Sequence, residues 1–297
     1  MNLQQLVTRH PLAAFLVWFA TVGQALAFVP VLTDLPSEPF LIAATFVGLL
    51  LPAVVITRIV EGPQGLRALR RRTFRVRVPA RWFLFGVIAV PVITAAATVA
   101  FAGPPPAVSA SGLASAVTFG YAVSLVVVLV TVNWWEEVAW MGFVQARLQR
   151  RHGAMRAAAI TGVAFGLGHV SLAFGDGTSA AVTLTALLLA VSLPFRALQA
   201  WVYNRTDSLL VVGLVHAAAN AVALGSVLGA GLLPRLYGDD SSSGLVFPVL
   251  AVIGLVVVIA TRARLGDPTA RRRAAAPRPP APLQTPPDPA DVGVVGS

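Results

Sequence analysis

The stretch VTFGYAVSLVVVLVTVNWWEEVAWMGFVQA at residues 117–146 is almost entirely apolar, yet it contains two adjacent glutamates, Glu136 and Glu137. About 20 apolar residues let a helix cross roughly 30 Å of hydrocarbon, so the stretch predicts a transmembrane helix. It is too long for one straight crossing, and we expect its first part to form a loop or a tilted lead-in before a crossing at 125–146. Carboxylates are costly in hydrocarbon, which makes the glutamate pair a candidate functional site.

The composition of the whole chain agrees with a membrane protein. Of its 297 residues, 57% are hydrophobic and 11% are charged, whereas soluble domains average roughly 45–50% apolar and about 25% charged residues. These values exclude a soluble globular protein and, for most of the chain, a disordered one. The chain has no cysteine, which excludes disulfides, thiolate metal sites and cysteine nucleophiles.

Eight apolar runs of this kind predict the fold class, an all-α, polytopic membrane protein with eight transmembrane helices. The predicted spans are 12–32, 40–60, 83–103, 117–146, 155–174, 179–203, 208–228 and 245–261.

All basic residues are arginines, and their distribution predicts the orientation of the spans. They concentrate at 61–82, at 147–156 and after residue 261, whereas the loops at 33–39 and 104–116 contain none. Cytoplasmic loops carry the excess of Lys and Arg, so we expect both termini in the cytoplasm and a multi-pass protein of a bacterial cell membrane. No nucleic-acid partner is expected, because the arginines lie between apolar runs rather than on one folded face.

The predicted domain organisation is simple. Residues 1–262 form an eight-helix transmembrane domain with a core at about 117–228, and the Pro-, Ala- and Arg-rich segment 263–297 forms a disordered cytoplasmic tail. For the first span there is an alternative, because small residues at 25–27 after an apolar run also fit the cleavage site of a secretory signal.

Two histidines also lie inside apolar spans. His169 follows Phe165 by four positions, and His216 precedes Asn220 by four, so each pair shares one helix face. The alanines at 217–219 favour close approach of a neighbouring helix. With the glutamates on a third helix, these residues predict a group of acid–base side chains in the membrane interior.

An alternative interpretation concerns the depth of the glutamates. They precede Arg147, the expected membrane surface, by about ten residues, which places them roughly 15 Å deep at about 1.5 Å per residue. The alternative ends the crossing at Trp134 and Trp135 as an interfacial aromatic belt and leaves the glutamates in cytoplasmic water.

The chemistry that fits these residues is hydrolysis of an amide within or beside the membrane. A carboxylate in an apolar pocket is suited to act as a general base on water, and His and Asn can donate hydrogen bonds to a developing oxyanion. Two histidines and one carboxylate are also a catalytic zinc ligand set. Glu136, His169 and His216 are therefore candidate zinc ligands, while a metal-free glutamate mechanism uses the same residues.

Three motifs resemble the CAAX protease and bacteriocin-processing (CPBP) family of intramembrane proteases, which includes the Rce1 prenyl endopeptidases. That family carries Glu-Glu-x-x-x-Arg, Phe-x-x-x-His and His-x-x-x-Asn on successive helices of an eight-helix fold. Here they read EEVAWMGF at 136–143, FGLGH at 165–169 and HAAAN at 216–220. The resemblance covers roughly residues 117–228.

The resemblance implies roles for these residues. Glu136 would activate water together with His169, His216 and Asn220 would hold the oxyanion, and Glu137 would be a supporting carboxylate. One position departs from the motif, because Met141 stands where the family has arginine. Glu137 must then stay protonated, find another cation or help to hold a metal.

The predicted function is an intramembrane endopeptidase, with membrane lipid and a membrane-associated protein or peptide as partners. Two alternatives remain from the sequence. A proton-coupled transporter could use the same glutamates and histidines as a relay, and a catalytically degenerate scaffold or immunity-type protein would be consistent with Met141.

Overall fold

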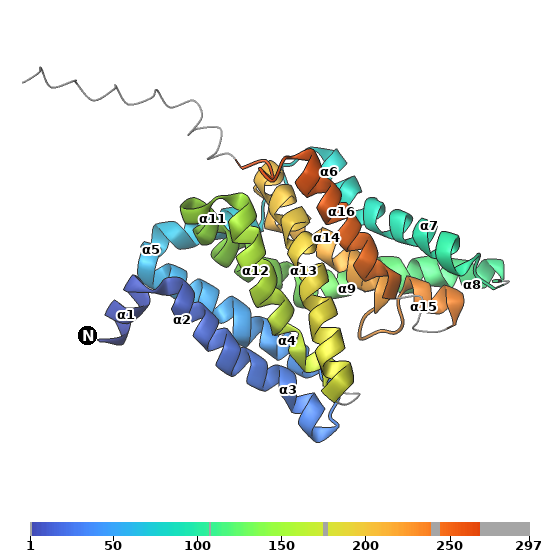
Figure 1. Ribbon diagram of the computed structural model, residues 1–297, viewed down its shortest axis with the longest axis horizontal. Coiled ribbons are helices and arrows are strands. Elements are labelled where there is room, and N and C mark those ends of the chain that lie inside the picture. The colour runs from blue at the N-terminus through green and yellow to red at the C-terminus, as the bar shows by residue number, and fades with distance from the viewer. Residues whose placement is uncertain (1, 107, 175–177, 239–243, 268–297) are drawn as a thin grey trace, which may run out of the picture.

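The computed structural model describes residues 2–106, 108–174, 178–238 and 244–267, and its secondary structure within these ranges is helical, without a strand (Figure 1). The expected all-α class is confirmed. In chain order the elements are α1 Leu3–Arg9, α2 Pro11–Trp18, η1 Phe19–Gly23, α3 Gln24–Thr33, α4 Ser37–Ala43, η2 Ala44–Leu50, α5 Leu51–Thr73, α6 Ala80–Leu84, η3 Phe85–Ala89, α7 Val90–Ala102, α8 Ala110–Ser115, η4 Ala116–Val123, α9 Ser124–Val128, η5 Leu129–Asn133, α10 Trp134–Glu137, η6 Val138–Gln145, α11 Ala146–His152, α12 Ala154–Gly168, η7 Val170–Ala173, α13 Thr178–Thr206, α14 Leu209–Ala223, α15 Leu232–Tyr237 and α16 Val246–Ala260.

Consecutive elements join into longer helices, because η1 to η6 are π-helical turns within them, and the helix Ser37–Thr73 is kinked at Gly62, where φ is 65°. Among the described residues, five such helices are long and apolar enough to cross a membrane. They are Pro11–Thr33, Ser37–Thr73, Ala80–Ala102, Ala110–His152 and Ala181–Thr206.

Three further apolar helices are shorter, namely Ala154–Gly168, Leu209–Ala223 and Val246–Ala260. Each predicted span therefore coincides with an apolar helix, although five of these helices reach spanning length. A multi-pass membrane protein is supported, while the count of eight crossings and the cytoplasmic position of both termini stay predictions.

Of the two expectations for the first part of 117–146, the loop is wrong, because the helix is continuous from Ala110 to His152. The lead-in is helical, and its tilt stays a prediction. No proline interrupts this run, so nothing in its sequence breaks the backbone hydrogen-bond ladder.

The predicted tail begins at residue 263, and its first residues belong to the folded part. Leu265 has no exposed surface, and its carbonyl oxygen accepts a hydrogen bond from Asn204 Nδ2 at 2.9 Å. The remainder of the predicted tail, 268–297, lies outside the described residues.

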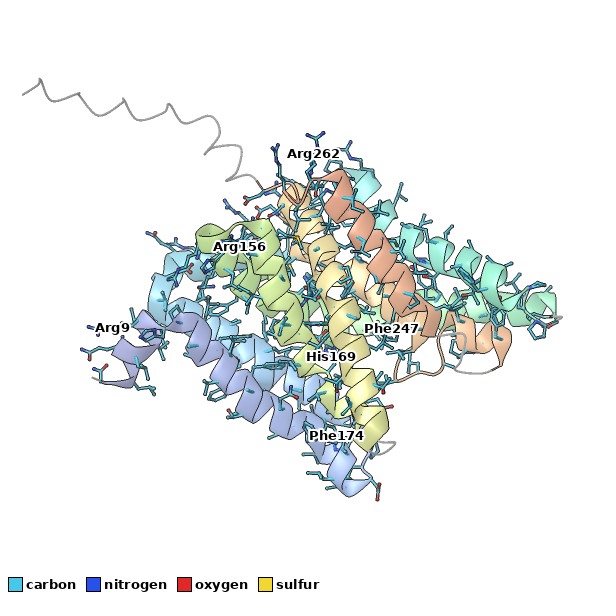
Figure 2. The ribbon with its side chains drawn as sticks, viewed as in Figure 1. Arg9, Arg156, His169, Phe174, Phe247 and Arg262 are labelled. Carbon is cyan, nitrogen blue, oxygen red and sulfur yellow. The ribbon has the colours of Figure 1, made fainter. Side chains whose placement is uncertain are left out.

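Three helices, α12, α13 and α14, lie at the centre of the structure. The two histidine motifs belong to α12 and α14, and α13 faces them. Figure 1 shows α12, α13 and α14 between the α2–α5 segment on one side and α7, α15 and α16 on the other. In Figure 2, Arg156 and Arg262 lie at one end of this central group and Phe174 at the opposite end.

Glycines allow the central helices to approach closely. A Cβ atom on Gly254 of α16 would lie 2.1 Å from the carbonyl oxygen of Pro194 on α13. A Cβ atom on Gly213 of α14 would lie 3.0 Å from the Cα atom of Trp134 on α10. Small residues at such crossings let helix backbones approach, which is the main source of helix association in lipid.

We expect Gly254→Ala to destabilise the protein, because its Cβ atom would meet a backbone oxygen that cannot rotate away. Overpacking of this kind typically costs about 1–3 kcal/mol. The measurement is the thermal unfolding temperature in detergent. Gly244→Ala is the matched control, because no atom lies within 4 Å of a Cβ built there. Equal unfolding temperatures for the two variants would contradict the close α13–α16 packing.

Candidate active site

The site is organised around a buried ion pair between Glu137 on α10 and Arg196 on α13. Neither side chain has exposed surface. Arg196 Nη1 donates to both carboxylate oxygens of Glu137, at 2.8 Å each. Because an isolated charge cannot be buried cheaply, each of these groups supports the ionised state of the other.

Two further groups donate to the same carboxylate. Gln199 Nε2 lies 3.1 Å from Glu137 Oε1, and its amide oxygen accepts from Arg196 Nη1. His216 Nδ1 lies 2.8 Å from Glu137 Oε1. An ionised carboxylate only accepts hydrogen bonds, so His216 carries its proton on Nδ1. Glu137 thereby fixes the orientation of this imidazole ring.

Glu136 has a different and sparser set of contacts. Its Oε2 accepts from Asn133 Nδ2 at 3.2 Å and lies 3.7 Å from His216 Nδ1. Asn133 Oδ1 in turn accepts from Asn220 Nδ2 at 3.1 Å. A chain of amides therefore connects Asn220 on α14 to the Glu136 carboxylate on α10.

His169 lies at the C-terminal end of α12, just beyond the last helical residue, Gly168. Its Nδ1 lies 2.8 Å from the carbonyl oxygen of Phe165. A carbonyl only accepts, so His169 Nδ1 carries a proton and satisfies one of the carbonyls left unpaired at a helix end. In the neutral ring, Nε2 is then the acceptor.

The ring of Phe165 contacts both imidazoles. Its centroid lies 4.3 Å from that of His169 and 5.7 Å from that of His216. The two histidines therefore flank one aromatic ring from different helices. Figure 2 labels His169 in the central region of the helical assembly.

Local sequence positions α14 for these contacts. Ser208 caps the helix, with its Oγ accepting from the Val211 amide at 3.3 Å and donating to the Arg75 carbonyl at 2.7 Å. Gly213, one turn before His216, permits the close approach to α10 described above. The alanines at 217–219 are all buried. The helix therefore presents His216 to Glu137 on α10 and Asn220 to Asn133 at the end of η5.

The structure brings the five predicted site residues together, directly or through one shared neighbour. Glu136 and His216 are 6% exposed, and Glu137 is 0% exposed. The alternative that placed both glutamates in cytoplasmic water beyond an aromatic belt is therefore wrong. Trp134 and Trp135 stack on each other, with 5.2 Å between ring centroids, immediately before the buried acids.

Sequence reasoning missed three residues of the site, namely Asn133, Arg196 and Gln199. All three are polar and lie within predicted apolar spans, which was the available signal. Arg196 also resolves the question raised by Met141. The family motif has its arginine one turn after Glu137, at the position of the fully buried Met141. In this protein the cation that pairs with Glu137 is Arg196, which lies on α13.

The described residues contain no cluster of side chains that would support the zinc alternative. Among the residues that the structure describes, no group of three or more His, Cys, Asp or Glu side chains could hold a metal ion. Both candidate histidines use Nδ1 for contacts within the protein, to Phe165 and to Glu137, so only Nε2 of each ring could bind a metal. The zinc set Glu136, His169 and His216 stays a prediction, and we derive no step through a metal.

The fold and site together define a helical membrane protein with a buried carboxylate–imidazole centre. Residues 118–222 match the model of the Rce1-like family, described as type II CAAX prenyl endopeptidase Rce1-like. The resemblance predicted from the three motifs is confirmed over this segment of the chain. It contains all five predicted site residues. No curated protein matches the chain.

We expect Arg196→Met to destabilise the protein strongly, because it leaves Glu137 buried without its cation. Removal of one partner of a buried ion pair typically costs about 3–5 kcal/mol. Adding Met141→Arg should restore much of the lost stability, since side chains four residues apart lie on the same face of a helix and can pair. The measurement is thermal unfolding in detergent, with exposed Arg156→Met as the control. If the double variant were no more stable than Arg196→Met, an arginine at position 141 could not replace Arg196 as the cation that pairs with Glu137.

Proposed function

We propose that the protein is an intramembrane endopeptidase of the CAAX-processing type, which hydrolyses a peptide bond of a membrane-associated protein or peptide. The observation that carries the proposal is the buried assembly of two carboxylates and His216 from α10 and α14, beside His169 from α12. This assembly lies within the segment that matches a family of prenyl endopeptidases.

In this proposal Glu136 activates the attacking water together with His169. Glu136 receives one amide hydrogen bond from Asn133 and has no arginine partner among the ion pairs of the described residues. Its carboxylate oxygens therefore keep more capacity than those of Glu137 to accept a hydrogen bond from the attacking water. His169 offers Nε2 as a second acceptor for the same water, because Phe165 occupies its Nδ1.

His216 and Asn220 hold the oxyanion that forms when water attacks the substrate carbonyl. To donate from Nε2 as well, His216 must carry protons on both ring nitrogens, and the Glu137 carboxylate accepts from Nδ1 at 2.8 Å. Asn220 uses one amide proton for Asn133, which leaves a second for the oxyanion. Glu137 and Arg196 act as positioning residues behind His216.

The proposed topology has eight membrane-embedded helices, both termini in the cytoplasm and a site that opens toward the cytoplasm. The support is the alternation of arginine-rich and arginine-poor connections along the chain. The shorter helices α12 and α14 lie among longer ones, as is common where a polar site is built inside a membrane protein.

We expect Glu136→Gln, His169→Ala and His216→Ala each to lower cleavage of a membrane-associated peptide by about 100- to 10,000-fold, the usual contribution of acid–base groups. The measurement is product formation by the purified protein in lipid vesicles, beside thermal unfolding to verify the fold. Glu38→Gln, in the first turn of α4 and away from the site, is the control. Full cleavage by all three site variants would refute the proposed enzyme, and proton flux without cleavage would favour a transporter.

The proposal includes a metal-free mechanism, and this part has its own test. We expect a zinc chelator to leave the cleavage rate unchanged, and we expect the purified active protein to hold less than about 0.1 zinc per chain by elemental analysis, since a resident catalytic metal is present near one per site. Loss of activity with chelator, restored by added zinc, would instead establish the ligand set Glu136, His169 and His216.

A further inference from the structure

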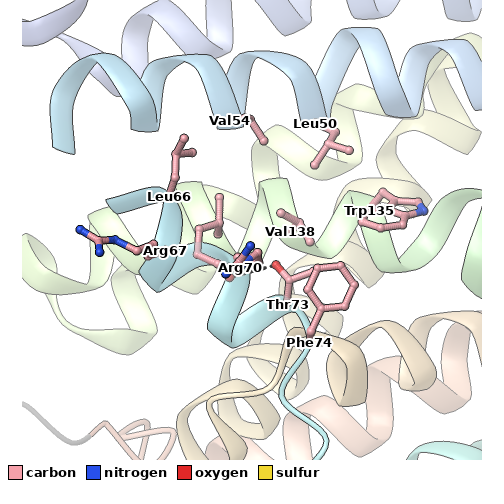
Figure 3. Close-up of a pocket in the computed structure, with 10 residues that line it drawn as sticks. Leu50, Val54, Leu66, Arg67, Arg70, Thr73, Phe74, Trp135 and Val138 are labelled. Carbon is pink, nitrogen blue, oxygen red and sulfur yellow. Dashed lines mark hydrogen bonds between the residues drawn. The ribbon is translucent and has the colours of Figure 1, made fainter. Parts of the chain in front are cut away.

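An apolar cavity lies on the opposite side of α10 from the two glutamates. Its volume is about 390 Å³, within the usual range of ligand pockets. Figure 3 shows it between the η2–α5 helix, represented by Leu50 and Val54, and the α10–η6 helix, represented by Trp135 and Val138. Apolar side chains make up most of its lining, and Arg67 and Arg70 lie at its edge.

A second, basic cleft adjoins this cavity. Its volume is about 650 Å³, and it shares Arg67, Arg70 and Phe74 with the apolar cavity. The rest of its lining comes from the chain directly after these residues, namely Arg71, Arg75, Val76 and Arg77. An apolar hollow thus continues into a hollow surrounded by guanidinium groups.

Most of these arginines have no acidic partner in the part of the chain that the structure describes. Arg75 pairs with Asp207 at 3.3 Å, and Arg72 donates to the Tyr203 hydroxyl at 2.6 Å. The ion pairs found within the described ranges include none for Arg67, Arg70, Arg71 and Arg77. The cleft therefore has an excess of positive charge that the described residues do not neutralise.

The exposed residues next to the cleft combine apolar and basic character. Phe74 is 52% exposed and Val76 is 61% exposed, and they alternate with the exposed Arg75 and Arg77. Large apolar side chains beside unpaired arginines are typical of a segment at the boundary between headgroups and acyl chains. Anionic lipids attract such basic segments at about 1 kcal/mol per arginine.

We infer that these two hollows together bind one anionic phospholipid. Its phosphate lies between Arg67 and Arg70, and one acyl chain extends into the apolar cavity along Trp135 and Val138. An acidic peptide or a free phosphate ion matches the basic cleft alone and leaves the apolar cavity empty. The inference rests on these two hollows and does not depend on the proposed catalytic roles.

Quenching of tryptophan fluorescence by brominated acyl chains tests this site directly. The full-length protein is placed in phosphatidylcholine vesicles, and brominated phosphatidylglycerol is added in one series and brominated phosphatidylcholine in another. We expect the anionic lipid to quench part of the fluorescence at mole fractions at least about tenfold lower than the neutral lipid, given about 1 kcal/mol per arginine. Trp135→Phe should remove this preferential component, because Trp135 lines the cavity.

Variants separate the site from general charge effects. Arg67→Gln with Arg70→Gln should abolish the preference for the anionic lipid. The matched control is Arg151→Gln with Arg156→Gln, two exposed arginines outside both hollows, which should retain it.

Several results would overturn the inference. They are equal quenching by both lipids, equal loss in the control variant, unchanged preferential quenching in Trp135→Phe, and displacement of the brominated lipid by inorganic phosphate or by an acidic peptide. The comparison of the two lipids uses the unmodified protein, so it stands even if a variant fails to fold.

Discussion

The arrangement of the site depends on one buried cation. The Arg196 guanidinium lies on α13, pairs with Glu137 on α10, and lies 4.0 Å over the ring of Phe165 on α12. Through Glu137 it also fixes His216 on α14. Its Nε and Nη2 atoms have no hydrogen-bond partner among the described residues. The rings of Phe165 and Trp140, with centroids 4.0 Å and 5.7 Å from the guanidinium carbon, add cation–π contacts. Four helices are therefore linked through one charged group.

This pairing gives two adjacent carboxylates different chemical properties. Glu137 accepts from Arg196, Gln199 and His216, and its lone pairs are largely occupied. Among the described residues, Asn133 is the group that donates to Glu136 at hydrogen-bond distance. A carboxylate whose oxygens already accept several hydrogen bonds can take few further ones, whereas one with a single amide donor can accept more. In the proposed mechanism the two neighbouring acids therefore divide into a positioning group and a proton acceptor.

The apolar segments of the fold could be predicted from the sequence because hydrophobicity along the chain reflects the surrounding solvent rather than tertiary contacts. The helix ends could not be predicted in the same way. The apolar run at 155–174 continues past the point where α12 ends, because His169 caps the helix with its side chain. The lead-in expected before 125 is helical, since chain length alone does not distinguish a long helix from a helix with a loop.

The site could be predicted only in part, again because a sequence pattern does not reveal tertiary contacts. His169, His216 and Asn220 were found because each stands out locally within an apolar run. The partner of Glu137 lies on a helix far along the chain, and no spacing rule connects the two positions.

The position of the cation has a structural consequence of its own. An arginine at position 141 would neutralise Glu137 from the same helix, and the charge balance would exist as soon as that helix formed. With Met141 buried there instead, neutralisation requires α13 to be docked against α10. An undocked α13 leaves an unpaired carboxylate in the interior, which is strongly unfavourable. The site in this protein is therefore complete only when the helices are assembled, so that correct packing of α13 and correct orientation of His216 form together.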